Sequence, residues 1–379
     1  MRAYCDGGGP RNRGGVTSIF AQRPGDGPAG GLARQRNISR RTADRATWHL
    51  QDAARWRTVG PGVQVMTTPK PTRCDHLDPA LSLPVIELDH VAMLDGGRIV
   101  EWEVVGRGAP LFWLEGGPGL PAHLARPDVE FLGRWFRCHL VNAPGCGRTT
   151  PPDDPVEGYS LASHVAFFEA VRVALGLGSI SLAGHSWGGL LAAAWAATHP
   201  GSIERLIVID GYAGAGSVDA AAALAERAAA FDRIRHVPGI DAAIAAFDRA
   251  LEVASTDERE AREAFDPVWP LYFADPASPL AREHVDRIRR EVRMNLDVGV
   301  AWDRVFENLD YRPLLRAIRC PTLILAGAHD FICGPVWNRA LAAAIPGARY
   351  VEIARAGHLP QYEAPDAVTA AIEVWLATS

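Results

Sequence analysis

The sequence contains almost no lysine and lacks long apolar runs, paired cysteines and a basic excess. One lysine stands beside 38 arginines, a ratio that we attribute to nucleotide composition. No stretch approaches the ~18 to 20 consecutive apolar residues that a bilayer span requires, so no membrane segment is expected. The six cysteines are far apart and form no C-x-x-C pair, which favours free thiols, no metal site and a reducing, cytoplasmic location. With 44 acidic against 39 basic residues, the chain offers no overall basic field for nucleic acid.

The N-terminal part differs in composition from the rest of the chain. Its first 65 residues contain 11 Arg, 4 Asp and no Glu, and they have no helical or strand period. We therefore expect residues 1–82 to form a basic, Gly- and Arg-rich, disordered extension. The segment lacks the apolar run of ~7 to 15 residues of a secretory signal, and its Gly and Pro content differs from that of an amphipathic transit peptide. Because Met66 lies just beyond the first 65 residues, we interpret those residues as a mis-assigned translation start or a dispensable tail.

From about residue 83 the sequence alternates between strand and helix patterns. Val85–Leu94 and Arg98–Val105 flank Asp95-Gly96-Gly97, which predicts a β-hairpin. A series of short apolar runs then predicts buried strands: Pro110–Leu114, Cys138–Asn142, Ile180–Ala183, Leu206–Ile209, Thr322–Ala326 and Tyr350–Ile353. Segments with helical periodicity lie between several of them: Leu161–Leu175, Gly188–Thr198 and Ala364–Ala377. This alternation predicts an α/β fold with a mostly parallel central sheet and helices on both faces.

One interval breaks the alternation. Between Ile209 and Cys320 the sequence has no convincing buried strand, whereas Val218–Arg249 and Ala281–Asn295 have helical patterns. A structureless loop of this length is implausible in a compact domain, so we predict a helical cap over the carboxyl ends of the strands, where ligands bind in open α/β sheets. The predicted domains are a core formed by residues 83–211 and 313–379, with the cap at 212–312.

A nucleophile motif follows one of the predicted strands. Residues 184–189 read Gly-His-Ser-Trp-Gly-Gly, which is G-x-S-x-G between a buried strand and a helix. Such a turn forces Ser186 into a strained conformation and presents its hydroxyl clear of the sheet, while the flanking glycines let neighbouring backbones approach. A chance Gly-Ser-Gly loop is the alternative, which the strand-to-helix setting disfavours.

A base and an acid for this serine follow later strands. His358 lies in Gly-His-Leu-Pro after the last predicted strand, and Asp330 follows the strand Thr322–Ala326. We predict a catalytic triad of Ser186, Asp330 and His358, since a serine alone is a poor nucleophile. Asp210, at another strand end, is the rival for the acid. His185 and His329 are interpreted as packing residues beside the chosen groups.

A glycine-rich loop after the strand Pro110–Leu114 is the candidate oxyanion loop. Residues 115–119 read Glu-Gly-Gly-Pro-Gly, and Pro118 has no N–H to donate. We predict that the N–H groups of Gly117 and Trp187 bind the oxyanion. An ordinary surface turn is the alternative.

These motifs resemble the α/β-hydrolase superfamily and, within it, the proline iminopeptidase-like branch known as peptidase family S33. The resemblance covers roughly residues 85–377 and rests on the segments 115–119, 142–149, 184–189, 330–335 and 357–360. It implies the α/β-hydrolase fold and a serine hydrolase that needs no metal or organic cofactor. The substrate implied is a small molecule or short peptide, with no nucleic acid and no membrane as partner; the oligomeric state stays open.

The sequence departs from that branch where substrate would bind. Glu115 stands where the family usually has histidine, Pro144 stands where it has arginine, and the cap lacks the Trp-Glu pair that often holds the substrate's amine. We expect a pocket lined by Trp269, Tyr272 and Phe273. The candidate carboxylates for an amine are Glu115, Glu263, Asp266 and Asp275. All of these except Glu115 could equally be packed or solvated cap residues, and Glu115 could simply brace its loop.

Three hypotheses for function follow. The first is a proline iminopeptidase-like aminopeptidase, a protease that releases an N-terminal residue from small peptides. The second is a carboxylesterase, amidase or lactonase acting on a small ester or amide. The third is a non-catalytic α/β-hydrolase binding protein, against which the intact triad pattern argues. Cys146 and Cys333 lie near the loops of the predicted site, as thiols sensitive to reagents or as inert buried residues.

Overall fold

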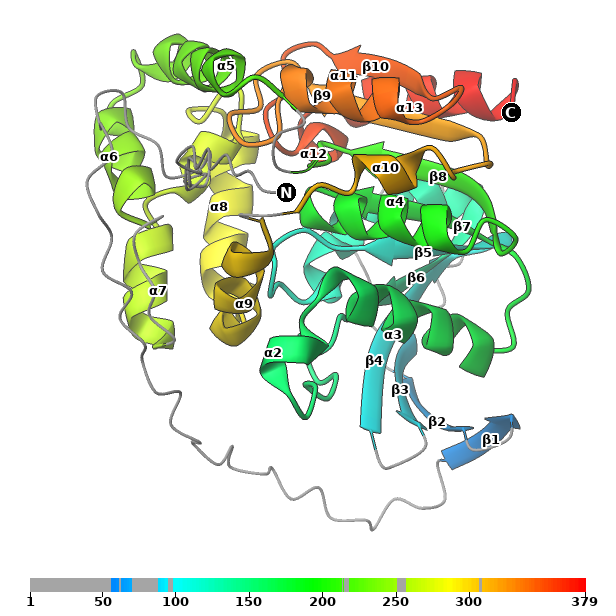
Figure 1. Ribbon diagram of the computed structural model, residues 1–379. Coiled ribbons are helices and arrows are strands. Elements are labelled where there is room, and N and C mark those ends of the chain that lie inside the picture. Colours follow the sequence, from blue (N-terminus) through cyan, green and yellow to red (C-terminus); the bar gives the residue numbers. More distant parts are fainter. Residues whose placement is uncertain are drawn as a thin grey trace, which may run out of the picture.

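The computed structural model describes residues 56–60, 63–69, 88–94, 98–212, 214, 218–250, 257–306 and 309–379. Within them ten strands form one sheet in the order β1-β2-β3-β4-β6-β5-β7-β8-β9-β10 (Figure 1). The strands are β1 (Trp56–Gly60), β2 (Val63–Pro69), β3 (Leu88–Leu94), β4 (Arg98–Gly106), β5 (Ala109–Leu114), β6 (Phe136–Val141), β7 (Ile180–His185), β8 (Ile203–Ile209), β9 (Thr322–Gly327) and β10 (Arg349–Ile353). Pairing is antiparallel from β1 to β6 and parallel from β6 to β10.

The predicted strands are confirmed, and so is the mostly parallel sheet. In the hairpin, Leu94 of β3 pairs with Arg98 of β4, while its turn at 95–97 lies outside the described residues. All six residues of β7 are buried, as is typical of a central parallel strand covered on both faces. Ser186 follows directly after the carboxyl end of this central strand.

Strands β1 and β2 differ from the disorder expected for residues 1–82. Val65 of β2 pairs with Ala92 of β3, so this part of the N-terminal segment extends the sheet. Val63 and Val65 alternate with Gln64, a short β-type pattern that Gly-Pro neighbours obscured in the sequence. The rest of residues 1–82 lies outside the described residues, and the domain boundaries stay a prediction.

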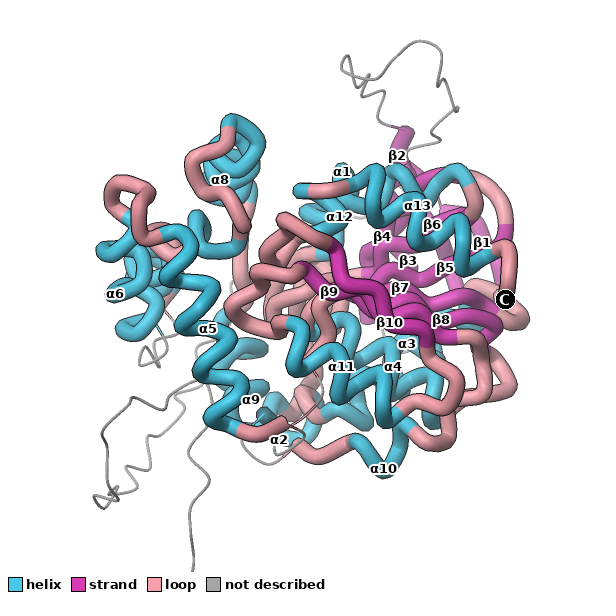
Figure 2. The backbone as a smooth tube through the Cα atoms, turned by 90° about the horizontal axis from the view of Figure 1, so that it is seen from above, coloured by secondary structure: helices cyan, strands magenta, loops and turns pink. Residues whose placement is uncertain are grey.

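Helices cover both faces of the sheet (Figure 2). The described helices outside the cap are η4 (Ala122–Ala125), α1 (Arg126–Val129), η5 (Glu130–Arg134), α2 (Pro155–Gly158), α3 (Leu161–Ala174), α4 (Trp187–Thr198), α10 (Arg312–Leu315), α11 (Pro335–Ala344), α12 (Pro360–Glu363) and α13 (Pro365–Leu376). Figure 2 shows α3, α4, α10 and α11 on one side and α1, α12 and α13 on the other. Neighbouring residues of β5 point to opposite faces of the sheet. Phe112 belongs to the hydrophobic core that includes α4, and Trp113 belongs to the core on the other face, which includes α13.

Every element described between β8 and β9 is helical. Besides α10, these are α5 (Ala220–Ile234), α6 (Ile240–Ala250), α7 (Glu258–Phe265), η6 (Trp269–Tyr272), α8 (Pro279–Glu291) and α9 (Leu296–Phe306), which lie together beside the sheet in Figure 1. Asp219, Asp257 and Ser278 cap the amino ends of α5, α7 and α8. None of the helices in the described part of the chain is long and apolar enough to cross a bilayer.

The linker between α8 and α9 fastens the cap to the core. The backbone N–H of Asn295 donates to the carbonyl of Gly119 at 2.9 Å. Its side-chain amide donates to the carbonyl of Gly145 at 2.7 Å. The cap is thus bonded directly to the loops that follow β5 and β6, at the edge of the sheet where Ser186 lies.

Candidate active site

Ser186 lies in the sharp turn between β7 and α4. Its φ of 53° and ψ of −120° are outside the regions that non-glycine residues usually occupy. The turn is possible because a Cβ on Gly188 would collide with the carbonyl oxygens of Leu114 and Glu115, and one on Gly184 would collide with the Gly188 backbone. Ser186 can adopt its strained conformation because Gly184 and Gly188 have no side chain, so the backbones around the turn come closer together than a Cβ would permit.

His358 and Asp330 form a buried pair at the same edge. The His358 Nδ1 atom lies 2.7 Å from the Asp330 Oδ2 atom. The other oxygen of Asp330 accepts hydrogen bonds from the N–H groups of Ile332 (2.7 Å) and Cys333 (3.2 Å). Asp330 is thus bonded both to its own loop and to the imidazole, which fixes the orientation of the ring.

The backbone of His358 is held from two sides. Its N–H donates to the carbonyl of Tyr272 in the cap at 2.8 Å, and its carbonyl lies 2.7 Å from Nε2 of His185. Burial, aided by the charge of His358, lowers the pKa of His185 to about 3, so its ring is neutral and donates from Nε2. His185 was expected only to pack; it also links the turn of Ser186 to the loop of His358.

Glu363 adds a second link between this loop and the cap. One of its carboxylate oxygens accepts the N–H of Gly357 and the other accepts the N–H of Ala274, each at 2.7 Å. Burial raises the pKa of Glu363 to about 7, against the opposing effect of its backbone hydrogen bonds. Sequence reasoning missed Glu363, because its partner in the cap is 89 residues away.

Asp210, the rival acid, lies beside the pair without bonding to the histidine. Its Oδ1 accepts the N–H of Gly327 at 2.8 Å. One ligand-type atom from each of His185, Asp210 and His358 lies within 4.8 Å of the others, which makes this the described cluster with the spacing nearest to a metal site. His185 and Asp210 already bond backbone groups, so the cluster is better explained as part of the triad's surroundings.

The loop at 115–119 packs against Ser186. A Cβ on Gly116 would lie 3.4 Å from Cβ of Ser186. Gly117 has a φ of 129°, which suits glycine, and is followed by a cis peptide bond to Pro118. Trp187 is the first residue of α4, so its N–H has no acceptor within the helix.

Cys333 interacts with Ser186, which sequence reasoning did not anticipate. Its thiol lies within hydrogen-bonding reach of the Ser186 hydroxyl. Burial and the nearby charge of Asp330 raise the pKa of Cys333 well above its usual range, and burial raises that of Cys146 to about 12. Both groups are therefore thiols rather than reactive thiolates. The four described cysteines, Cys138, Cys146, Cys320 and Cys333, are free.

Glu115 is held beside the site by its own strand. The indole N–H of Trp113 donates to Oε2 of Glu115 at 2.7 Å. Burial raises the pKa of Glu115, opposed by this bond, by the Gly116 N–H and by the charges of Arg287 and His358. The carboxyl group of Glu115 therefore interacts electrostatically with the imidazole of His358 and with Arg287 of α8.

The three aromatic residues expected to line a pocket have different positions. The Tyr272 ring packs edge-on against the His358 imidazole, with 5.4 Å between the ring centroids. The ring of Trp269 packs against Tyr272, with 5.1 Å between the centroids. Phe273 instead packs against His284 of α8. Tyr272 is therefore the residue of the three that contacts the candidate triad.

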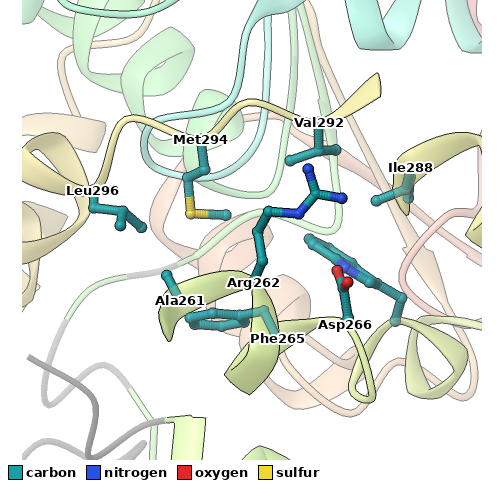
Figure 3. A pocket seen from close by; sticks show the side chains of 9 residues that line it. Ala261, Arg262, Phe265, Asp266, Ile288, Val292, Met294 and Leu296 are labelled. Carbon is teal, nitrogen blue, oxygen red and sulfur yellow. The ribbon is translucent and has the colours of Figure 1, made fainter. Parts of the chain in front are cut away.

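A small pocket opens within the cap (Figure 3). It is lined by Ala261, Arg262, Phe265, Asp266, Trp269, Ile288, Val292, Met294 and Leu296. Trp269 and Asp266 are at this pocket, whereas Glu263 and Asp275 are exposed. Of the candidate cap carboxylates, Asp266 lines this pocket.

The family model for the alpha/beta hydrolase fold matches residues 110–365. The chain belongs to the α/β-hydrolase fold family. The proline iminopeptidase of Lactiplantibacillus plantarum is 26% identical over 288 residues, which are 71% of this chain and 92% of that protein. The proline iminopeptidase of Lactobacillus delbrueckii subsp. lactis is 29% identical over 265 residues, which are 66% of this chain and 84% of that protein.

Among solved structures, a thermophilic esterase from Thermogutta terrifontis is similar to this hydrolase. It is 27% identical, with a TM-score of 0.52, and the match covers 75% of this chain and 95% of the esterase. The family and the named relatives together support a hydrolase activity and a proline iminopeptidase-like assignment within the α/β-hydrolases.

Proposed function

We propose that this hydrolase is a serine hydrolase that forms an acyl-enzyme on Ser186. His358 takes the proton of the hydroxyl and later passes it to the leaving group, while Asp330 fixes the imidazole tautomer and stabilises the imidazolium. The observation that carries the proposal is the 2.7 Å hydrogen bond from His358 Nδ1 to Asp330, in a loop bonded to the residue before Ser186. With Nδ1 engaged, Nε2 is left for the serine. Water then releases the acyl group.

The oxyanion of each tetrahedral intermediate is assigned to the N–H groups of Gly117 and Trp187. Trp187 contributes the free N–H at the start of α4, and Gly117 lies in the loop packed against Ser186. Preorganised donors of this kind contribute about 10²- to 10³-fold each to kcat.

For the substrate we propose a short peptide from which an N-terminal proline or similar small residue is released. The relatives named proline iminopeptidase match this chain over most of their length. Glu115, in the field of His358, offers a carboxylate to the substrate's free amine. Tyr272, beside His358, offers an apolar wall to the N-terminal ring. A cytoplasmic location accords with such a substrate.

A small ester, amide or lactone is the alternative substrate. The surroundings of Glu115 favour it in two ways. Glu115 already accepts hydrogen bonds from Trp113 and the Gly116 N–H, so it could serve only to brace the loop. The positive charge of Arg287 nearby opposes a bound ammonium group. The similar esterase shows that this fold accommodates ester hydrolysis in a relative at 27% identity.

A substrate panel separates the two. Prolyl p-nitroanilide is compared with its N-acetylated form, which lacks the amine, and with p-nitrophenyl acetate and butyrate. We expect turnover of the free-amine arylamide and none of the acetylated one. In Glu115→Gln, KM for the arylamide should rise by about tenfold or more, as expected for loss of a charged hydrogen bond, with ester turnover little changed. Ester turnover without arylamide turnover would reject the iminopeptidase proposal.

A non-catalytic binding protein is the lower-ranked alternative. It predicts no turnover of any compound in the panel by folded protein. The strained conformation of Ser186 argues against it, since strain of this kind is concentrated at functional sites.

A further inference from the structure

Asp210 has a buried oxygen without a hydrogen-bond partner. The residue follows β8 in a left-handed conformation, with a φ of 47°, and its side chain is inaccessible to solvent. Oδ1 accepts the N–H of Gly327, while Oδ2 has no partner among the groups that the structure describes. A fully buried carboxylate with one unsatisfied oxygen is costly, so the oxygen needs an explanation.

Both oxygens of the neighbouring acid, Asp330, have hydrogen-bond partners. Its two oxygens meet three donors, the N–H groups of Ile332 and Cys333 and the ring of His358. The side chain of Asp210 lies within hydrogen-bonding reach of it. Asp330 therefore has a hydrogen-bond partner for each of its oxygens, whereas Asp210 has one oxygen without a partner among the described groups.

Two adjacent buried carboxylates cannot both carry a charge at moderate cost. Burial and the charge of Asp330 raise the pKa of Asp210 well above its usual range, and its bond from Gly327 opposes this only in part. The charge of Glu363 raises the pKa of Asp210 further. A proton on Oδ2 would turn the unpartnered oxygen into a hydrogen-bond donor.

We propose that Asp210 stays protonated and donates a hydrogen bond to the Asp330 carboxylate, which makes it a positioning residue for the acid of the triad. The catalytic role of Asp210 in this inference rests on the proposed serine mechanism, whereas its protonation and its hydrogen bond to Asp330 do not. The neutral carboxyl holds Asp330 in line with His358 without placing a second negative charge beside the imidazole. It also explains why an acid occupies each of two neighbouring strand ends.

The variants that test this follow from the backbone. Asp210→Asn keeps an oxygen for Gly327 and supplies an amide N–H for Asp330, and asparagine tolerates a positive φ. Asp210→Gly removes the donor without straining the backbone. We expect kcat to fall by less than about fivefold in Asp210→Asn and by about 10- to 100-fold in Asp210→Gly, with KM little changed. Asp330→Asn, the control, should lose about 10⁴-fold in kcat.

Two results would overturn the proposal: Asp210→Asn as damaging as Asp330→Asn, or Asp210→Gly as active as wild type. The first would mean that Asp210 works as an anion. A second measurement does not depend on activity or on how the glycine variant folds. The infrared difference spectrum between wild type and Asp210→Asn at pH 8 should contain the carbonyl band of a protonated carboxylic acid. Its absence would refute the inference while leaving the serine mechanism intact.

Discussion

Nε2 of His185 lies 2.7 Å from the backbone carbonyl of His358, so the residue before the proposed nucleophile holds the loop of the proposed base. Because the His185 ring is neutral, its Nε2–H donates an ordinary hydrogen bond to the carbonyl rather than a charge-assisted one. The two loops come from strand ends 173 residues apart. Their relative position, on which proton transfer depends, is therefore fixed in part by one side chain.

Replacing His185 should separate this positioning from packing. His185→Gln keeps an N–H donor, whereas His185→Phe leaves the His358 carbonyl buried without one. We expect the free energy of unfolding to fall by about 1–3 kcal/mol more in His185→Phe than in His185→Gln, with a larger loss of kcat. Denaturant titration and steady-state kinetics on the best substrate provide the measurements. Equal effects in both variants would mean that the hydrogen bond contributes nothing.

The same histidine predicts an acid-side pH dependence of stability. Its pKa is lowered from 6.5 to about 3, so the unfolded state takes up a proton that the folded state does not. Its contribution is present above about pH 6.5 and is lost as pH falls towards 3, by at most about 1.4 kcal/mol per pH unit. Wild type should therefore lose stability relative to His185→Gln between pH 6.5 and 4.5. A constant difference across that range would contradict a buried neutral His185.

Glu363 predicts a pH dependence of stability of the opposite sign. Its pKa is raised from 4.5 to about 7, so the folded state binds more protons than the unfolded state between these values. Stability from this group is full below about pH 4.5 and is lost as pH rises through 7. Glu363→Gln imitates the protonated acid. The unfolding free energy of wild type minus that of Glu363→Gln should thus decline across this window, by at most about 1.4 kcal/mol per pH unit, and then level off.

A methyl group at Gly188 should disturb the turn of Ser186. A Cβ there would collide with the carbonyl oxygens of Leu114 and Glu115, both backbone atoms that cannot turn away. We expect Gly188→Ala to lower the free energy of unfolding by about 1–3 kcal/mol or more. Gly299 in α9 is the matched control, because nothing lies within 4 Å of its Cβ position. Gly299→Ala should stabilise by about 0.5–1 kcal/mol, and equal effects of the two changes would refute the close-approach argument.

The sequence was informative where chemistry depends on neighbouring residues. The turn at Ser186 is encoded within six consecutive positions, and the strand-end rule brought Asp330 and His358 to one edge. That rule could not separate Asp330 from Asp210, because both strand ends meet at that edge and only the loop path decides which carboxylate meets the imidazole. The bridge from Glu363 to Ala274 depends on how the cap docks, which no local pattern encodes.

The central claim is that Ser186 is an activated nucleophile. The direct measurement is the intact mass of the protein after exposure to a fluorophosphonate, with peptide mapping of the adduct and with Ser186→Ala, checked for native circular dichroism, as control. We predict one adduct per chain, on Ser186, and none in the variant. Folded wild type that stays unlabelled, or labelling that persists in Ser186→Ala, would contradict the account.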